Sequence, residues 1–144
     1  MTQILVVGHG RFATTLLETA RMLTGTTGHA LAVQFPVGTG VDELTAQVSA
    51  ALDTLIADRG ENAGAGQVLV LADVAGGSPA RVALGEALAG RAEVVSGANL
   101  PMLIDALFGA ETTEPAELAR RVIASAQAGI RNLASEIRGG GVPA

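Results

Sequence analysis

Several residue types are missing from the sequence, and each absence excludes a class of protein. There is no cysteine, which excludes disulfides and zinc–thiolate sites. Tryptophan and tyrosine are also absent, so only Phe12, Phe35 and Phe108 are aromatic, too few for the stacking platform of a single-strand nucleic-acid binder. No apolar run approaches the roughly 20 residues that span a membrane, and no signal peptide is evident at the N-terminus. These absences favour a cytoplasmic protein.

Positive charge is also scarce. The formal net charge is −5 and the basic residues form no cluster, which argues against nucleic acid as a partner, because neutralising phosphates requires lysine and arginine. The chain has 144 residues, 49% of them hydrophobic, with a mean hydropathy of +0.42, which suits one domain with a core of ordinary size. We expect a single domain over residues 1–136 and a flexible glycine-rich tail over residues 137–144.

Short apolar runs alternate with segments of helical periodicity. Strands are expected over residues 3–7, 30–35, 68–72 and 93–96, and helices over 11–23, 41–56, 78–88, 99–108 and from 113 or 114 to 128. This alternation predicts an α/β fold, doubly wound, with a mainly parallel four-stranded sheet and helices on both faces. Residues 130–133 fit either a short strand or more helix.

Three glycine-bearing turns follow strands of this predicted sheet. The first carries His9 between two glycines, the second carries Asp73 and the segment 76–79, and the third spans residues 96–99. Because the carboxyl ends of parallel strands share one rim, we expect these turns to converge. His29 precedes a strand and belongs to the opposite rim, so it receives no function.

The residue types on this rim suit nucleophilic chemistry. A neutral imidazole, here that of His9, attacks phosphorus or carbon. A carboxylate such as Asp73 can accept the hydrogen of one ring nitrogen, which fixes the tautomer and leaves the lone pair of the other free. Ser78 is expected as a helix N-cap, and with the free amides of the two helix starts it forms an anion site for a phosphoryl group. Gly10 and Gly77, at these helix starts, complete the predicted phosphoryl-binding set.

Other interpretations compete with this one. Gly8-x-Gly10-x-x-Ala13 matches a dinucleotide fingerprint, but the strand expected to end in an acidic residue ends Gln34-Phe35-Pro36. A nucleotide-binding, Rossmann-like module therefore stays an alternative. No metal site is expected, because the rim holds one histidine and no cluster of carboxylates.

Two readings concern charged residues near the rim. On spacing alone, a structural role for Asp73 as the cap of its turn is about as well supported as a catalytic role. Arg11 and Arg81 lie where they can meet a phosphate, although a solvated surface arginine is the default interpretation.

Segments 7–10, 71–79 and 96–103 together resemble the IIA domain of the mannose-type sugar phosphotransferase system, collinearly from the first strand to about Leu133. The resemblance implies a phosphotransferase without a cofactor. Such a domain takes a phosphoryl group from the phosphohistidine of the carrier HPr and passes it to a IIB partner, while membrane IIC and IID components import the sugar. His9 matches the phosphorylated histidine, reacting through Nε2, Asp73 the carboxylate on its other nitrogen, and Ser78 a phosphoryl-binding residue.

The resemblance also implies a homodimer that exchanges a fifth, antiparallel strand, here residues 129–133. The chain departs from the family at two places beside the site. Val74-Ala75 stand where members of the family often have an aromatic residue, and Ala80-Arg81 stand where they often have Phe-Asn, so the apolar rim that meets HPr or IIB is expected to differ. The phosphotransfer subunit of dihydroxyacetone kinase is the second family considered, but it usually has His-Ser where this chain has His9-Gly10. No residue encodes the sugar.

Overall fold

A parallel four-stranded sheet in the order β2-β1-β3-β4 organises the chain. The computed structural model describes residues 1–26, 28, 30–58 and 67–139. The strands are β1 (Gln3–His9), β2 (Ala30–Phe35), β3 (Val68–Ala72) and β4 (Glu93–Val95), and every neighbouring pair is parallel. The predicted α/β sheet is confirmed. β1 runs two residues further than expected, because its ladder with β2 continues to the pair His9 and Phe35.

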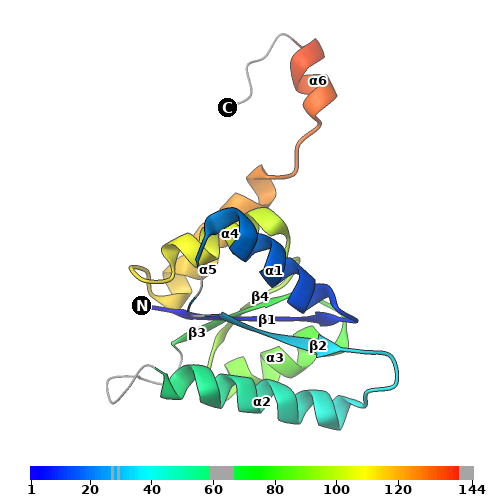
Figure 1. Cartoon of the computed structure of the whole chain (residues 1–144), viewed down its shortest axis with the longest axis vertical. Helices are drawn as coiled ribbons and strands as arrows, with labels where there is room; N and C mark the ends of the chain where they lie inside the picture. Colours follow the sequence, from blue (N-terminus) through cyan, green and yellow to red (C-terminus); the bar gives the residue numbers. More distant parts are fainter. Residues whose placement is uncertain (27, 29, 59–66, 140–144) are drawn as a thin grey trace.

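Helices cover both faces of the sheet, as predicted. They are α1 (Phe12–Thr24), α2 (Val41–Ala57), α3 (Ser78–Leu88), α4 (Leu100–Gly109), α5 (Pro115–Ala128) and α6 (Leu133–Arg138). Figure 1 shows α1, α4 and α5 on one face and α2 and α3 on the other. None of the helices in the described part of the chain is both long and apolar enough to cross a membrane.

The core has two parts, one on each face of the sheet, and the central strands β1 and β3 contribute to both. Successive side chains of a strand point to opposite faces, so Ile4 and Val6 of β1 pack under α1 and α4, while Leu5 and Val7 pack against α2 and α3. All of β3 is buried as well. Replacing one such leucine by alanine costs about 2–5 kcal/mol. The loops at the carboxyl ends of β1 and β3 therefore stand on the most firmly packed part of the molecule.

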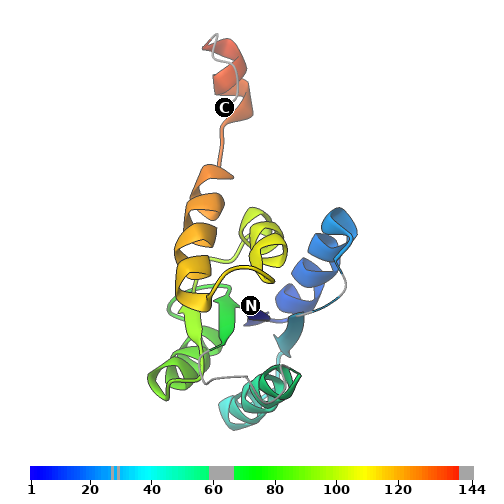
Figure 2. The same ribbon diagram turned by 90° about the vertical axis from the view of Figure 1, so that its left-hand side faces the viewer.

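The C-terminal segment differs from the expected strand. Residues 130–132 belong to no strand, and Leu133–Arg138 form the short helix α6. Figures 1 and 2 show this segment leaving the body after α5 and ending in α6, away from the sheet. Without a neighbouring strand to supply ladder hydrogen bonds, the backbone turns into a helix instead, and the side chain of Asn132 caps it by accepting a hydrogen bond from the Ser135 N–H at 2.9 Å.

Of the expected tail over residues 137–144, residues 137 and 138 are helical. Residues 140–144 and His29 lie outside the described residues. We call residues 130–139, with α6, the C-terminal arm.

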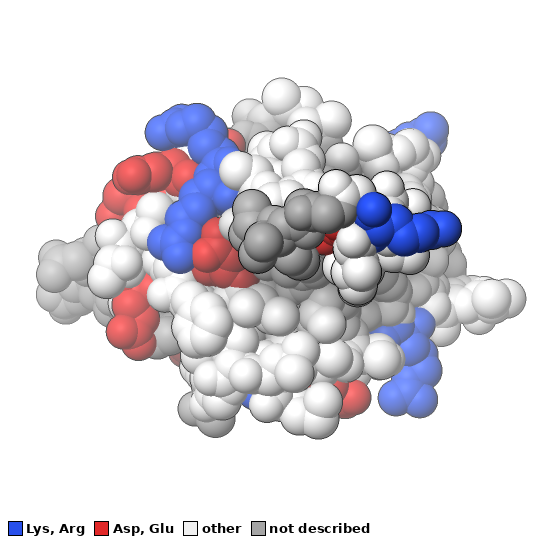
Figure 3. All heavy atoms as spheres, turned by 90° about the horizontal axis from the view of Figure 1, so that it is seen from above, with Lys and Arg blue, Asp and Glu red and all other residues white. Residues whose placement is uncertain are grey.

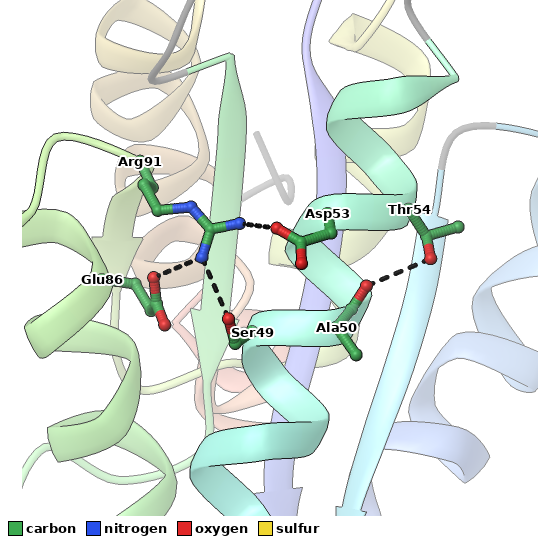
Figure 4. A network of polar contacts seen from close by, with 6 residues as sticks. All are labelled: Ser49, Ala50, Asp53, Thr54, Glu86 and Arg91. Carbon is green, nitrogen blue, oxygen red and sulfur yellow. Dashed lines mark hydrogen bonds and ion pairs between the residues drawn. The ribbon is translucent and has the colours of Figure 1, made fainter.

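A polar network ties α2 to α3 next to the amino end of β4 (Figure 4). The Arg91 guanidinium donates to Glu86 Oε2 at 2.9 Å and to Ser49 Oγ at 3.2 Å, and it forms an ion pair with Asp53. Within α2, the Thr54 hydroxyl donates to the carbonyl of Ala50 at 3.1 Å. Since Arg91 precedes β4, this network stabilises the end of the sheet opposite the rim that carries His9.

Candidate active site

His9 and Asp73 meet at the carboxyl ends of the adjacent strands β1 and β3. Asp73 Oδ2 accepts a hydrogen bond from the backbone N–H of His9 at 2.8 Å and lies 2.6 Å from Nδ1 of its ring. The second oxygen, Oδ1, accepts from the N–H of Val74 at 2.8 Å. The His9 side chain is 50% exposed and that of Asp73 only 12%. A buried carboxylate thus holds one edge of a ring whose other parts remain accessible.

The carboxylate is set up to stay ionised. Burial raises the pKa of Asp73, but hydrogen bonds from the backbone N–H and ring of His9 and from the Val74 N–H together hold that pKa below its ordinary value. An anionic Oδ2 acts as an acceptor, so the neutral ring carries its hydrogen on Nδ1. The lone pair of the ring is then on Nε2, as a nucleophile requires.

The Nε2 edge of the ring lies against the start of α3. A Cβ atom placed on Gly77 would be 2.5 Å from Cε1 of His9 and 3.2 Å from Nε2. Atoms in ordinary van der Waals contact are 3.4–4 Å apart, so no residue with a side chain fits here unless the ring moves. The absence of a side chain at Gly77 is what allows the ring to face the helix terminus.

The start of α3 differs by one residue from the prediction. The N-cap is Gly77, and Ser78 is the first helical residue rather than the cap, making no cap hydrogen bond through its side chain. The first N–H groups of a helix lack intrahelical acceptors. Pro79 has no N–H, so Ser78 and Ala80 supply the free amides. The Ser78 hydroxyl also has no hydrogen-bond partner among the described residues, which leaves it available to an anion.

Gly10 shapes the turn on the other side of His9. Its φ of +56° is in the left-handed region, which glycine adopts without strain. Its N–H donates to the carbonyl of Phe35 at 2.8 Å, and the Gly77 N–H donates to that of Val74 at 3.3 Å. Both amides are engaged in this structure, and the phosphoryl-binding role of these two glycines stays a prediction. The geometry shows that the missing side chain at Gly77 gives the ring room, whereas a Cβ on Gly10 would meet no atom within 4 Å.

Phe35 is a site residue that the sequence reasoning missed. It ends β2 and pairs with His9 in the ladder, and the centroids of the two rings are 5.8 Å apart at an angle of 56°. The phenyl ring therefore bounds one side of the imidazole. His9 and Phe35 are each the last residue of their strand. That correspondence points to their contact only once β1 and β2 are known to pair.

The third turn supports Asp73 rather than His9. The N–H of Gly97 donates to the carbonyl of Asp73 at 3.1 Å, and that of Ala98 donates to the carbonyl of Ala72 at 2.9 Å. Asn99 caps α4 by accepting from the Met102 N–H. The three turns share one rim: the first carries His9, the second carries Asp73 and the start of α3, and the third holds the backbone of Ala72 and Asp73 in place.

The chemistry open to this arrangement is group transfer through nitrogen. In the described ranges, no three His, Cys, Asp or Glu side chains gather as a metal-ligand set would require. The site has instead a half-exposed imidazole, a carboxylate held against its Nδ1, and the start of α3 next to its Nε2 edge.

Comparisons with known proteins agree with one another. The sequence model described as "PTS system fructose IIA component" matches residues 3–123. The fructose-specific EIIA component of Bacillus subtilis is 31% identical over 108 residues, which cover 74% of this chain and 69% of that protein. The mannose-specific EIIAB component of Escherichia coli K12 is 31% identical over 140 residues, 92% of this chain but only 40% of the longer protein.

Solved structures show the same relationship. The phosphotransferase system component EIIA from Streptococcus agalactiae superposes with a TM-score of 0.79 at 25% identity, covering 94% of this chain and 99% of the other. The mannose/sorbose-specific IIA subunit from Enterococcus faecalis gives 0.78 at 28% identity, covering 91% and 93%.

Proposed function

Because the chain belongs to the fructose- and mannose-type IIA family of the sugar phosphotransferase system, we propose that it carries phosphoryl groups on Nε2 of His9. The observation that supports this assignment is the 2.6 Å contact between His9 Nδ1 and Asp73 Oδ2, which leaves Nε2 as the free nucleophile beside the start of α3. The membership of the family gives a phosphoryl-carrier role in a sugar phosphotransferase system. The atom that carries the group is the proposal.

The transfer step needs no proton to leave the ring. The Nε2 lone pair attacks the phosphorus of the donor's phosphohistidine, and the N–P bond of the donor breaks with its electron pair returning to the donor's ring nitrogen. His9 then carries a positive charge on its ring, with the hydrogen still on Nδ1, and Asp73 stabilises that charge through the same hydrogen bond. The amides of Ser78 and Ala80 and the Ser78 hydroxyl hold the phosphoryl oxygens while charge spreads over them.

The proposed donor is phospho-HPr and the proposed acceptor is a IIB component. Both must bring a side chain to Nε2, and the half-exposed ring, flanked by Gly10 and Gly77, gives them room. Val74 is exposed next to the ring's anchor and offers a small apolar contact to either partner. The membrane IIC and IID components act downstream of IIB and do not meet this chain in the proposed scheme.

We propose in addition that the chain works as a homodimer. The C-terminal arm exposes Ile130, Leu133 and Ile137, with 77%, 61% and 73% of their surface accessible, and α6 has no buried residue. Among the described residues, β4 pairs with β3 alone, so its other edge has no partner strand there. Exchange of the C-terminal arm between two subunits would bury its apolar side chains and cover the edge of β4. This agrees with the exchanged segment that the family resemblance implies for residues 129–133.

The decisive experiment is phosphorylation by purified components. Incubated with phosphoenolpyruvate, enzyme I and HPr, the wild type takes up one acid-labile, base-stable phosphoryl group, and the label then moves to a IIB protein. His9→Gln takes up none, while keeping its unfolding temperature. Equal labelling of wild type and His9→Gln contradicts the proposal, as does the absence of label on a folded wild type.

A further inference from the structure

Some arginine side chains near His9 form no hydrogen bond or ion pair with the described part of the chain. The sequence contains no lysine, so arginine supplies every cationic side chain. Five described arginines donate to oxygen atoms of the chain: Arg21, Arg91, Arg121, Arg131 and Arg138. In the described part of the chain, Arg11, Arg81 and Arg120 have no such acceptor. Two of these three stand at the helix starts that flank His9.

The charge distribution agrees with this placement. Figure 3 looks down on the face that bears the C-terminal arm, and most of its red acidic side chains gather at the left, the side at which the strands begin, with blue side chains among them. Further blue side chains lie at the right, the side at which the strands end, with little red beside them. In a chain of net charge −5, a rim with unpaired arginines is suited to hold a negative group.

Arg81 stands on α3, the helix whose start lies against the Nε2 edge of the ring. Its N–H donates to the Gly77 carbonyl at 3.1 Å, so Arg81 lies one helical turn after the N-cap. A Cβ on Gly77 would be 3.2 Å from His9 Nε2. Helical side chains lean toward the N-terminus of their helix, here toward the end of α3 that lies against the ring.

Arg11 stands at the start of a different helix, α1. It is the N-cap residue of α1 and lines a groove of about 400 Å³ with Phe12, Thr15 and Leu100. That groove follows α1 and α4, whereas Nε2 lies against Gly77 of the other helix start. The two unpaired arginines of the rim thus serve different surfaces.

We propose that Arg81 binds the phosphoryl oxygens of phosphorylated His9 and so shifts the phosphoryl equilibrium toward this chain. The inference rests on the proposed phosphorylation of His9. The guanidinium presents parallel N–H groups that match two oxygens of a phosphoryl group, while the Ser78 and Ala80 amides approach from the helix end. Arg81 makes and breaks no covalent bond.

The test separates the phosphoryl group from the partner protein. Phosphoramidate, a small donor that phosphorylates histidine without a carrier, is added to wild type, Arg81→Gln, Arg81→Lys and the control Arg120→Gln, whose arginine is exposed on α5 and also lacks an acceptor. Product is followed by ³¹P NMR. The same four proteins are then equilibrated with phospho-HPr.

We expect Arg81→Gln to lose roughly three- to tenfold, both in the rate with phosphoramidate and in the equilibrium with phospho-HPr, as suits a charged hydrogen bond at a partly solvated site. Its phosphohistidine resonance shifts relative to wild type. Arg81→Lys falls between, because lysine keeps the charge but loses the paired geometry. Arg120→Gln matches wild type in both reactions.

The other outcomes overturn distinct claims. A folded wild type that takes up no phosphoryl group on His9 from either donor removes the proposed function and the role of Arg81 with it. Normal wild-type labelling with an Arg81→Gln variant indistinguishable from it overturns the role of Arg81 alone. A variant that is slow with phospho-HPr but normal with phosphoramidate places Arg81 against the donor protein, and this too refutes binding of the phosphoryl oxygens.

Discussion

Replacing Gly77 by alanine is expected to impair phosphoryl transfer without unfolding the protein. The new Cβ would stand 2.5 Å from His9 Cε1, about 0.9 Å closer than the 3.4 Å at which ordinary contacts begin. The imidazole must therefore shift by on the order of 1 Å, and a misplacement of that size costs about 10²-fold in rate. The shift also endangers the 2.6 Å contact with Asp73, which limits how far the ring can turn without losing its tautomer.

The stability of the variant is expected to change little. Gly77 has φ −88° and ψ 165°, a conformation that alanine adopts without strain. Alanine gains about 0.4–1 kcal/mol by restricting the unfolded chain, and as an N-cap it loses about as much relative to glycine. The two effects offset each other to within about 1 kcal/mol.

A matched control is available at the neighbouring position. A Cβ on Gly76 meets no atom within 4 Å and its φ is not positive, so Gly76→Ala tests the loss of a glycine without the collision. The measurements are the transfer rate from phospho-HPr, the thermal unfolding temperature, and the NMR signal of the His9 ring proton on Nδ1. If Gly77→Ala transfers at the wild-type rate, the claim that its missing side chain positions the ring is wrong.

Three further predictions concern other contacts. Asp73→Asn is expected to slow transfer about 10- to 100-fold, since a charge-assisted hydrogen bond worth about 1.5–3 kcal/mol is lost; a normal rate measured by rapid quench excludes Asp73 from the step. Because the folded-state pKa of Asp73 is lowered, its stabilisation is present above the unfolded pKa of about 3.9 and is lost as the pH falls through the lower folded-state pKa. Urea unfolding of wild type and Asp73→Asn should therefore differ more at pH 7 than at pH 3, and a constant difference contradicts the assignment. Leu133→Asp is expected to convert a dimer to a monomer in analytical ultracentrifugation, and an unchanged mass argues against exchange of the C-terminal arm.

The sequence predicts those parts of the structure that depend on pattern. The apolar run 68–72 indicated a central strand, and the rule that parallel strands end on one rim placed His9 beside Asp73, although 64 residues separate them. Fine geometry was out of reach, because the position of a helix start relative to a ring depends on packing. For this reason, only the structure reveals that Gly77 leaves room for the imidazole and that Phe35 lies beside it.

The ends of elements were predicted less well, for a related reason. Ser78 and Pro79 both favour a helix start, and a one-residue shift between cap and first turn changes little in free energy. The segment 130–133 fitted strand and helix equally, and its conformation depends on what lies beside it. In the single chain that is solvent, so Asn132 caps α6 and no ladder forms.

The residue that anchors His9, Asp73, directly follows β3, and this determines when during synthesis the site can form. As the chain is synthesised, β1 emerges first and its histidine is then an ordinary solvated ring. The backbone and ring of His9 acquire their acceptor only after β3 has been made and has inserted beside β1. A nascent or misassembled chain therefore presents no oriented imidazole, and the proposed phosphorylation of His9 would report that β3 has paired with β1.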